Sequence, residues 1–236
     1  MYKKYTNLVY LVRHGENPAN VHHIFSYKKV DYSLTPKGRL QAQQTGEYFV
    51  DKPIDEIYAS PLKRARETGE CIAQAVHLPV TIVEQFREIN VGTLEDQPPS
   101  EESWGEHNRI VHAWFNGQND ESFPGGENYY QLLERFRDGL RLVTQGKEGK
   151  RIVIAGHGGM FTRTLRDICP GLDITPLLSR ENHNCSITPL ELTTEGENVT
   201  GKMLQWASIE HLYGDAAELI PGTLLAQPDE SDAVHI

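Results

Sequence analysis

Short apolar runs rich in β-branched residues alternate along the chain with longer stretches in which apolar and polar positions follow a helical pattern. The short runs predict buried strands at residues 7–13, 55–59, 79–83 and 151–155. The longer stretches predict helices at residues 36–50, 61–76 and 127–145. Strands and helices that alternate in this way form a sheet with helices on both faces, so the pattern predicts an α/β fold.

Two of the predicted helices carry a start signal. Thr35 and Ser60 are each followed directly by a proline. A hydroxyl side chain caps the first free N–H groups of a helix, and proline is favoured at the first helical position because its missing N–H is not needed there. We therefore expect these helices to begin at Pro36 and Pro61.

The pattern weakens between residues 97 and 126, where proline, glycine and acidic residues are frequent and only residues 104–115 resemble an amphipathic helix. We expect this segment to be an excursion over the edge of the sheet. Further along, a helix is expected to begin near Gly158. Residues 185–192 and 202–207, joined through residues 196–198, predict a closing hairpin.

The composition is that of a globular protein with one substantial core: 236 residues, of which 38% are hydrophobic and 24% charged. After Tyr213, five acidic residues occur without any Lys or Arg. We therefore expect one domain over residues 1–213 and an acidic tail over residues 214–236. The tail is expected to be loosely ordered or docked on a partner subunit.

Net charge and cysteine content restrict the classes of function that this chain can have. A formal net charge of -10 disfavours binding to nucleic acid but allows a small phosphorylated ligand, which needs only a local cluster of cations. No apolar run approaches the ~20 residues that span a bilayer, and the first residues lack a signal-peptide pattern. We expect a cytoplasmic protein without a membrane partner. Three widely spaced cysteines favour reduced thiols over disulfides or a zinc site.

Basic and histidine residues follow three of the predicted strands at the point where each strand ends. Residues 13–16, Arg-His-Gly-Glu, come after the first strand, Arg64 lies just after the second, and His157 follows the strand at 151–155. Ligands of open α/β sheets bind at the carboxyl edge, so we expect two histidines and two arginines to meet there. An Arg-His pair alone would more often be an ion pair or a cap. The convergence indicates a functional site.

Several motifs, in order, resemble the histidine phosphatase superfamily, which includes the cofactor-dependent phosphoglycerate mutases and many small phosphatases. The resemblance spans residues 8–207. It rests on residues 13–16 with Asn20, Leu34-Thr35-x-x-Gly38-x-x-Gln41-Ala42, Ser60-Pro61-Leu62-x-Arg64-Ala65-x-x-Thr68, Glu88 followed by Gly92, and His157-Gly158-Gly159. It implies a three-layer α/β/α sandwich with a mostly parallel central sheet, and a homodimer.

By this resemblance His14 is the nucleophile and would carry the phosphoryl group as a phosphohistidine, without a metal or other cofactor. A neutral imidazole is nucleophilic near pH 7, which suits this role. Arg13 and Arg64 would bind the phosphate oxygens, and His157, if protonated, would add a third cationic donor. Backbone N–H groups of the helix that begins near Gly158 would also bind substrate.

The resemblance assigns Glu88 as the acid that protonates the leaving alkoxide and then activates the hydrolytic water. Glu84 and Glu95 are alternatives by proximity alone, and both are equally well explained as surface carboxylates. Asn20 and Ser26 match positions that touch the phosphate or the substrate in the family.

A loop with four basic or histidine residues offers a second set of contacts. His22, His23, Lys28 and Lys29 could meet a second negative group, such as a carboxylate, or form an ordinary solvated loop, and the sequence leaves both open. A zinc site at His22 and His23 is disfavoured because adjacent residues rarely bind one ion.

The sequence favours hydrolysis of a phosphate ester over transfer of its phosphoryl group by a mutase. A 2,3-bisphosphoglycerate-dependent phosphoglycerate mutase needs a positively charged lid, but residues 96–126 carry six acidic residues against one cation, Arg109. Gly159 stands where such mutases typically have asparagine. We therefore predict a phosphomonoesterase acting on a small phosphorylated metabolite, a sugar phosphate or a phosphoglycerate-type compound.

Two alternatives stay open. The first is the mutase. The second is a non-catalytic interaction module, which the acidic tail supports and the complete set of catalytic residues disfavours. The sequence does not identify the metabolite.

Overall fold

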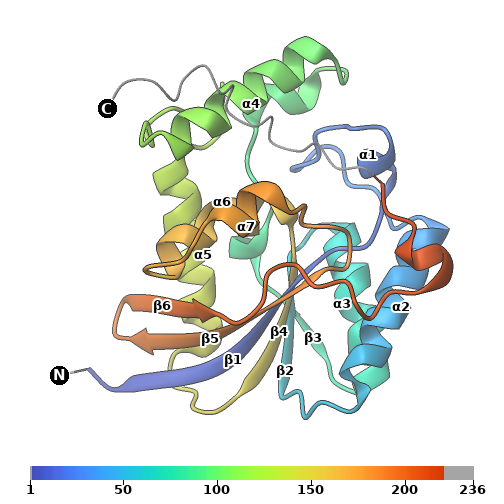
Figure 1. Cartoon of the computed structure of the whole chain (residues 1–236), viewed down its shortest axis with the longest axis vertical. Coiled ribbons are helices and arrows are strands. Elements are labelled where there is room, and N and C mark those ends of the chain that lie inside the picture. The colour runs from blue at the N-terminus through green and yellow to red at the C-terminus, as the bar shows by residue number, and fades with distance from the viewer. Residues whose placement is uncertain (1, 221–236) are drawn as a thin grey trace.

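The computed structural model describes residues 2–220, which form a six-stranded sheet with helices on both faces (Figure 1). The strand order is β3-β2-β4-β1-β5-β6. The strands are β1 (Lys4–Arg13), β2 (Glu56–Ala59), β3 (Val80–Ile82), β4 (Arg151–Gly156), β5 (Ile187–Glu195) and β6 (Asn198–Met203). β3, β2, β4 and β1 pair in parallel, and β5 pairs antiparallel with both of its neighbours. The prediction of a mostly parallel α/β sheet is confirmed.

Alternating residues of β1 bury their side chains in two separate cores. Val9 and Leu11 enter a core with α5 (Tyr129–Thr144) and α6 (Gly158–Ile168), while Tyr10 and Val12 enter another with α2 (Pro36–Val50) and α3 (Lys63–Val76). Such alternation is what a strand buried on both faces requires. It produces the three expected layers.

The remaining helices lie near the carboxyl ends of the parallel strands (Figure 1). They are α1 (Pro18–Val21), α4 (Glu101–Phe115) and α7 (Thr175–Ser179). The excursion predicted over residues 97–126 is therefore present, with its helix beginning three residues earlier than expected because Ser100 caps it. This end of the molecule holds the site.

One of the two predicted helix starts is confirmed and the other is wrong. The Thr35 hydroxyl accepts a hydrogen bond from the N–H of Gly38 at 3.0 Å, so α2 begins at Pro36. In contrast, α3 begins at Lys63 with Leu62 at its N-cap. The Ser60 hydroxyl, which bonds to the His157 ring at 2.7 Å, accepts from the Leu62 N–H at 3.3 Å and caps no N–H group inside the helix.

The closing hairpin is present, but its second strand was predicted several residues too late. Glu195 pairs with Asn198 across a two-residue turn. Gly196 has a φ of +61°, a conformation that glycine adopts without strain, and it allows this tight turn. β6 therefore starts immediately after the turn and ends at Met203.

The first part of the predicted tail packs against α2. A short 3-10 helix (Gly214–Ala217) lies there, where Gln41 donates to the Ala216 carbonyl at 3.1 Å and Lys37 to the Glu218 carbonyl at 2.7 Å. Residues 221–236 lie outside the described residues, so the proposed division at residue 213 stays a prediction.

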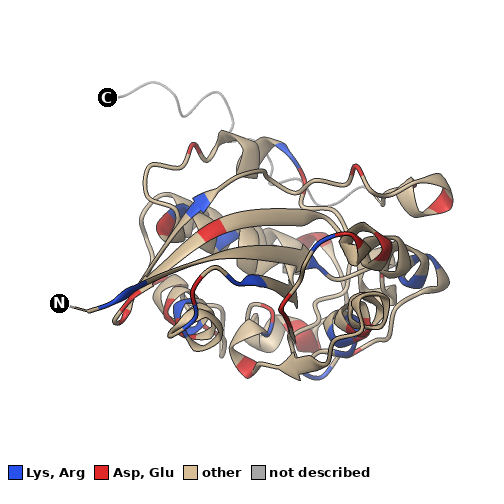
Figure 2. Ribbon diagram, turned by 90° about the horizontal axis from the view of Figure 1, so that it is seen from below, with Lys and Arg blue, Asp and Glu red and all other residues tan. Residues whose placement is uncertain are grey.

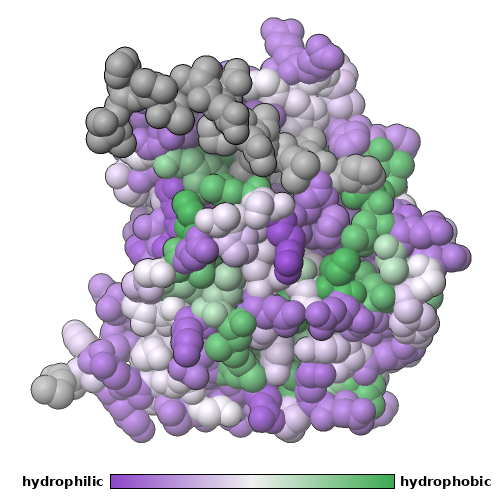
Figure 3. Space-filling model, in the orientation of Figure 1, coloured by the Kyte–Doolittle hydropathy of each residue, from purple (hydrophilic) through white to green (hydrophobic). Residues whose placement is uncertain are grey.

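Surface properties agree with the composition. Charged residues concentrate on the helices and loops, and the strands carry few (Figure 2). Hydrophilic residues predominate on the face shown in Figure 3, and apolar residues form smaller patches there. Within residues 2–220 no helix has both the length and the apolar character needed to cross a membrane. The three cysteines are all unpaired thiols, as predicted.

Candidate active site

A cavity of about 250 Å³ opens at the carboxyl edge of the parallel strands. Most of the predicted site residues line it or lie directly behind it. We call the part around His14, Arg13, Arg64 and His157 the inner end. The outer end is formed by Phe25, Trp104, His107, Arg163 and Arg180.

His14 directly follows β1 and is a buried residue, 3% exposed. Its Nδ1 lies 2.7 Å from the carbonyl oxygen of Gly15, which can only accept, so Nδ1 carries the proton. Its Nε2 accepts a hydrogen bond from Nε of Arg64 at 3.1 Å. Burial, with the charges of Arg64 and Arg13, holds the pKa of His14 well below its ordinary value. The ring is therefore neutral, with its lone pair on Nε2.

Arg64, in the first turn of α3, connects His14 to the neighbouring loop. Besides bonding His14, it donates to the hydroxyl and to the carbonyl oxygen of Ser26, both at 2.8 Å. Burial lowers the pKa of Arg64 to about 10, so the guanidinium stays charged at neutral pH. Ser26 is thus held by Arg64 at the cavity wall, where its substrate-binding role was predicted.

Arg13 and His157 each present an unsatisfied polar atom. Arg13 donates to the Asn182 carbonyl through Nη1, while its Nε is buried without a partner among residues 2–220. Nδ1 of His157 is also buried and has no partner there, and Nε2 bonds to Ser60. Buried polar atoms are rarely left unpaired.

The idea of a protonated His157 is not supported. Burial, followed by the charge of Arg64 and the neighbouring His14 ring, holds the pKa of His157 well below its ordinary value. The two imidazole rings lie 5.2 Å apart. At neutral pH His157 is therefore a neutral hydrogen-bonding group in the substrate-free protein, and the positive charge of the inner end comes from the arginines.

Glu88 lies at the N-terminus of α6, facing the same cavity. Its carboxyl oxygens accept hydrogen bonds from the N–H groups of Ile89 at 2.9 Å, Met160 at 2.9 Å and Gly159 at 3.2 Å. The helix N–H groups that were expected to bind substrate are, in two cases, occupied by Glu88. The start of α6 therefore holds the Glu88 carboxyl group.

Arg135 on α5 supports the segment that carries Glu88. It donates to the carbonyl oxygens of Gln85 and Arg87 at 2.8 and 2.7 Å, and to that of Glu88 at 3.3 Å. It also pairs with the largely buried carboxylate of Glu127 at 2.8 Å. Sequence analysis missed this support, because an arginine in an amphipathic helix is usually a solvated residue.

Asn20 and Gly158 occupy the cavity wall as predicted. The Asn20 side chain accepts from Asn184, which also donates to the His14 carbonyl at 2.9 Å. A Cβ on Gly158 would lie 3.0 Å from Cδ of Arg13, so any larger residue would displace that arginine. Asn184 was not predicted, since no motif marks it.

The two alternative acids have other roles. Oε1 of Glu95 accepts hydrogen bonds at 2.7 to 3.1 Å from four successive N–H groups, those of residues 27–30. Although burial opposes the effect, these bonds lower the pKa of Glu95 below its ordinary value. Glu84 pairs at the surface with Arg87. Neither lines the cavity.

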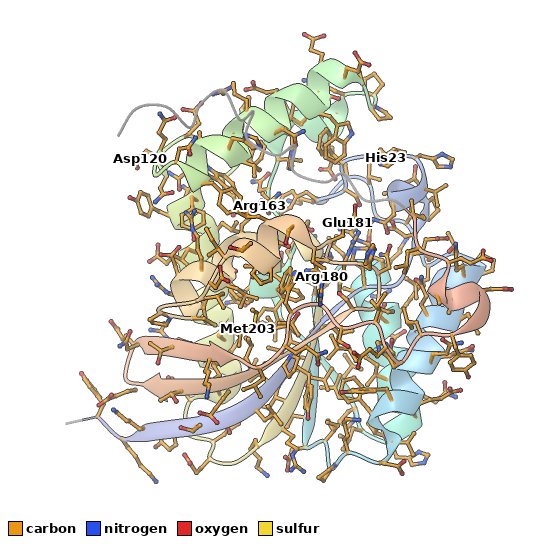
Figure 4. The ribbon with its side chains drawn as sticks, viewed as in Figure 1. His23, Asp120, Arg163, Arg180, Glu181 and Met203 are labelled. Carbon is orange, nitrogen blue, oxygen red and sulfur yellow. The ribbon has the colours of Figure 1, made fainter. Side chains whose placement is uncertain are left out.

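The four basic and histidine residues of the loop do not line this cavity. Lys29 forms a surface ion pair with Asp96, and His23 lines a smaller adjoining pocket of about 130 Å³. The cations at the outer end instead come from α6 and the end of α7, namely Arg163 and Arg180 (Figure 4).

Aromatic rings form the remaining wall of the outer end. The Phe25 and Trp104 rings lie 4.4 Å apart, and Trp104 lies 5.0 Å from His107. Burial lowers the pKa of His107 to about 4, so this ring is uncharged at neutral pH. Among residues 2–220 no group of three or more His, Cys, Asp or Glu could hold a metal ion. Metal independence stays a prediction.

The similarity of the chain to known proteins shows its family. A family model described as histidine phosphatase superfamily (branch 1) matches residues 9–203. The chain therefore belongs to the histidine phosphatase superfamily.

Individual relatives carry both phosphatase and mutase names. An uncharacterized phosphatase, PhoE, of Bacillus subtilis is 34% identical over 163 residues, covering 69% of this chain and 78% of that protein. A probable phosphoglycerate mutase, GpmB, of Salmonella choleraesuis is 31% identical over 217 residues, covering 89% and 97%. The structure of a phosphoserine phosphatase from Entamoeba histolytica, in complex with 3-phosphoglyceric acid, superposes with a TM-score of 0.69 at 23% identity, over 88% of this chain and 100% of that one.

Proposed function

We propose that the protein hydrolyses a small phosphorylated metabolite, a sugar phosphate or a phosphoglycerate-type ester, through a phosphohistidine on His14. The observation that carries this proposal is the neutral His14 ring, whose Nε2 lone pair lies in a cavity beside two guanidinium groups. Arg13 and His157 contribute unsatisfied polar atoms at the same place. This combination provides a nucleophile together with a pocket for an oxyanion.

In the first step the Arg64 N–H that bonds to Nε2 of His14 moves to a phosphate oxygen, which frees the Nε2 lone pair. Nε2 then attacks phosphorus, and the bond to the ester oxygen breaks. Glu88, in its protonated form, gives its proton to the departing alkoxide. The His14 ring becomes positively charged as the N–P bond forms. Its Nδ1–H already donates to the Gly15 carbonyl, and that bond strengthens as the ring acquires charge.

In the second step water attacks the phosphohistidine. The Glu88 carboxylate takes a proton from the water, phosphate leaves, and the neutral ring of His14 is restored. Arg13 and Arg64 stabilise the oxygens of the phosphoryl group in both steps, which is the main contribution a protein makes to phosphoryl transfer.

Rapid-quench labelling tests this proposal. With a ³²P-labelled ester the wild type should carry acid-labile phosphate during turnover, and His14→Ala should carry none and release no phosphate. His77→Asn is the matched control, because His77 lies at the far end of α3 in a left-handed conformation that asparagine tolerates. Full activity of His14→Ala would exclude the mechanism.

A phosphoglycerate mutase is the second candidate, favoured by the similarity to GpmB over nearly the whole of that protein. Residues 96–126 stand where a mutase has its lid, and they favour hydrolysis. The residues of this segment that line the cavity are Trp104 and His107, and both are uncharged. Arg109 is bound to Glu106 and Glu121 instead. Incubation with 3-phosphoglycerate and 2,3-bisphosphoglycerate separates the two functions, since a mutase forms 2-phosphoglycerate and a phosphatase releases inorganic phosphate.

The cytoplasmic location, the homodimer and the lack of nucleic-acid partners stay predictions from the sequence. We also infer that catalysis requires no metal, because the proposed steps use only His14, Glu88 and the arginines. Retention of full activity after treatment with a chelator is the expected result.

A further inference from the structure

The peptide group that joins Gly15 to Glu16 is hydrogen-bonded at both of its ends. Its carbonyl oxygen accepts from Nδ1 of His14 at 2.7 Å. Its N–H donates to Oε1 of Gln41, a residue of α2, at 2.9 Å. A peptide group is planar and stiff, so its N–H and its C=O cannot turn independently. The side chain that holds the N–H therefore also sets the direction of the carbonyl that faces the His14 ring.

The Gln41 amide is itself fixed from the other side. Gln41 is 1% exposed, and its Nε2 donates to the Ala216 carbonyl at 3.1 Å. A carbonyl oxygen can only accept, so the NH₂ group faces Ala216 and the amide oxygen faces the Glu16 N–H. Two partners at opposite ends thus leave this buried amide one orientation.

The start of α2 packs directly against the same peptide group. A Cβ added to Gly15 would lie 2.5 Å from the carbonyl oxygen of Gly38, and one added to Gly38 would lie 2.0 Å from that of Glu16. This backbone contact requires glycine at both positions. Gln41 follows Gly38 by three residues and so lies on the same face of the helix. The helix that contacts the loop through Gly38 therefore also presents the Gln41 amide to it.

These contacts bear on the state of His14 that the proposed attack needs. The ring must carry its proton on Nδ1 and its lone pair on Nε2, and the Gly15 carbonyl selects this tautomer by accepting from Nδ1. A peptide whose N–H is already bonded offers a more strongly polarised carbonyl, because consecutive hydrogen bonds reinforce one another. Gln41 is not among the residues that line the cavity, so it acts on the ring and not on the substrate.

We infer that Gln41 is a positioning residue of the reaction, which holds the His14 ring in its reactive tautomer and orientation through the peptide group between Gly15 and Glu16. This inference rests on the proposed function, because it gives Gln41 a task only if His14 is the nucleophile. The chain of contacts runs from Ala216 through Gln41 and the peptide group to Nδ1 of His14.

The test compares Gln41→Met with a matched variant on the same helix, Gln44→Met. Gln44 is 4% exposed, and its amide accepts from the Tyr213 N–H at 2.9 Å and donates to the Tyr213 carbonyl at 3.2 Å. Each substitution removes two hydrogen bonds from a buried amide of α2, but of the two residues Gln41 alone bonds to the loop after β1. If Gln41→Met does not fold, Gln41→Asn replaces it, since its shorter side chain draws the amide away from Glu16.

Kinetics with p-nitrophenyl phosphate separate attack from binding. We expect Gln41→Met to lower kcat/KM by about 10- to 100-fold, because a small misplacement of a reacting group is costly. Competitive inhibition by inorganic phosphate reports binding alone and should stay within about twofold of wild type, since the arginines are unchanged. Gln44→Met should keep the wild-type kcat/KM even where it loses stability.

NMR of protein labelled with ¹⁵N-histidine reports the tautomer of His14 without any turnover, and the signals that His14→Ala lacks identify this ring. We expect a proton on Nδ1 alone in the wild type and in Gln44→Met. Gln41→Met should show a mixture of the two neutral tautomers, because the Gly15 carbonyl is no longer held toward Nδ1.

Three outcomes would overturn the inference. The first is an equal loss of kcat/KM in the two methionine variants, which would make the amides important only for the stability of α2. The second is a wild-type kcat/KM in Gln41→Met. The third is a loss of kcat/KM with an unchanged tautomer of His14. If the wild type released phosphate from no ester, the proposed function would fail instead, and the tautomers would still show whether Gln41 orients the ring.

Discussion

The inner and outer ends of the cavity differ in how their side chains are held. At the inner end His14 is fixed by the Gly15 carbonyl and by Arg64, and Arg64 is fixed in turn by Ser26. At the outer end the walls are aromatic rings and an arginine whose Nε has no partner among residues 2–220. The side chains of the inner end are thus fixed by hydrogen bonds within the protein, whereas the outer end keeps a polar atom without such a bond.

Replacing Arg64 should have the largest effect, because this residue holds Nε2 of His14 and, in the proposed mechanism, binds phosphate. We expect Arg64→Met to lower kcat by about 10³-fold for every ester, including p-nitrophenyl phosphate. Steady-state kinetics measures this. Arg66→Met, two residues further along the same helix, provides the comparison and should behave as wild type. A loss smaller than tenfold in Arg64→Met would show that the inner end is not held as described.

Replacing Glu88 should affect only some substrates. Glu88→Gln keeps the shape of the side chain but cannot donate a carboxyl proton, so kcat for an alkyl phosphate should fall by about 10²–10⁴-fold. Hydrolysis of p-nitrophenyl phosphate should change little, because its phenolate leaves without protonation. Glu84→Gln is the matched control at the exposed pair with Arg87. Equal slowing of both substrates would assign the acid role to another residue.

Replacing Glu95 should affect stability rather than chemistry. Its carboxylate holds four N–H groups of the loop that leads from Ser26, so Glu95→Gln should lower the free energy of unfolding by ~1–3 kcal/mol in urea denaturation. Asp96→Asn, at the neighbouring exposed pair with Lys29, should cost little. Equal costs for the two variants would contradict the proposed role of Glu95.

The difference in stability between the wild type and Glu95→Gln should also depend on pH. Because the pKa of Glu95 is lower in the folded protein than in the unfolded chain, its contribution is fully present above the unfolded value near 4.5. It is lost as the pH falls through the folded value. Wild type and Glu95→Gln should therefore converge in stability at acid pH, and a constant difference would exclude this origin.

The inner end could be predicted from the sequence because its residues follow buried strands, whose apolar runs are easy to recognise. Arg13 is the last residue of β1, His14 and His157 come directly after β1 and β4, and the parallel pairing of these strands brings them together. Ser60 was expected to cap a helix, but its hydroxyl bonds to His157 and to the N–H of Leu62, and the helix begins at Lys63. A local start signal does not show such a bond to a distant residue.

The outer end could not be predicted in the same way. Arg163 and Trp104 reach the cavity from helices on two separate segments, and their positions depend on how those helices pack. The loop with His22 and Lys29 was the more visible cationic segment, yet it does not line the cavity. Arg135 and Asn184 act through backbone carbonyl groups and another side chain, and such contacts leave no motif.

The position of β1 in the sheet affects when the site can form during synthesis and folding. Its partners are the distant strands β4 and β5, and Arg13 lies opposite Gly156. The His14 N–H bonds to the Gly156 carbonyl, and Asn184 holds the His14 carbonyl. During synthesis His14 emerges early, but these two partners of its backbone follow some 140 to 170 residues later. A nascent chain should therefore be inactive until most of it has been synthesised, and activity should return late in refolding.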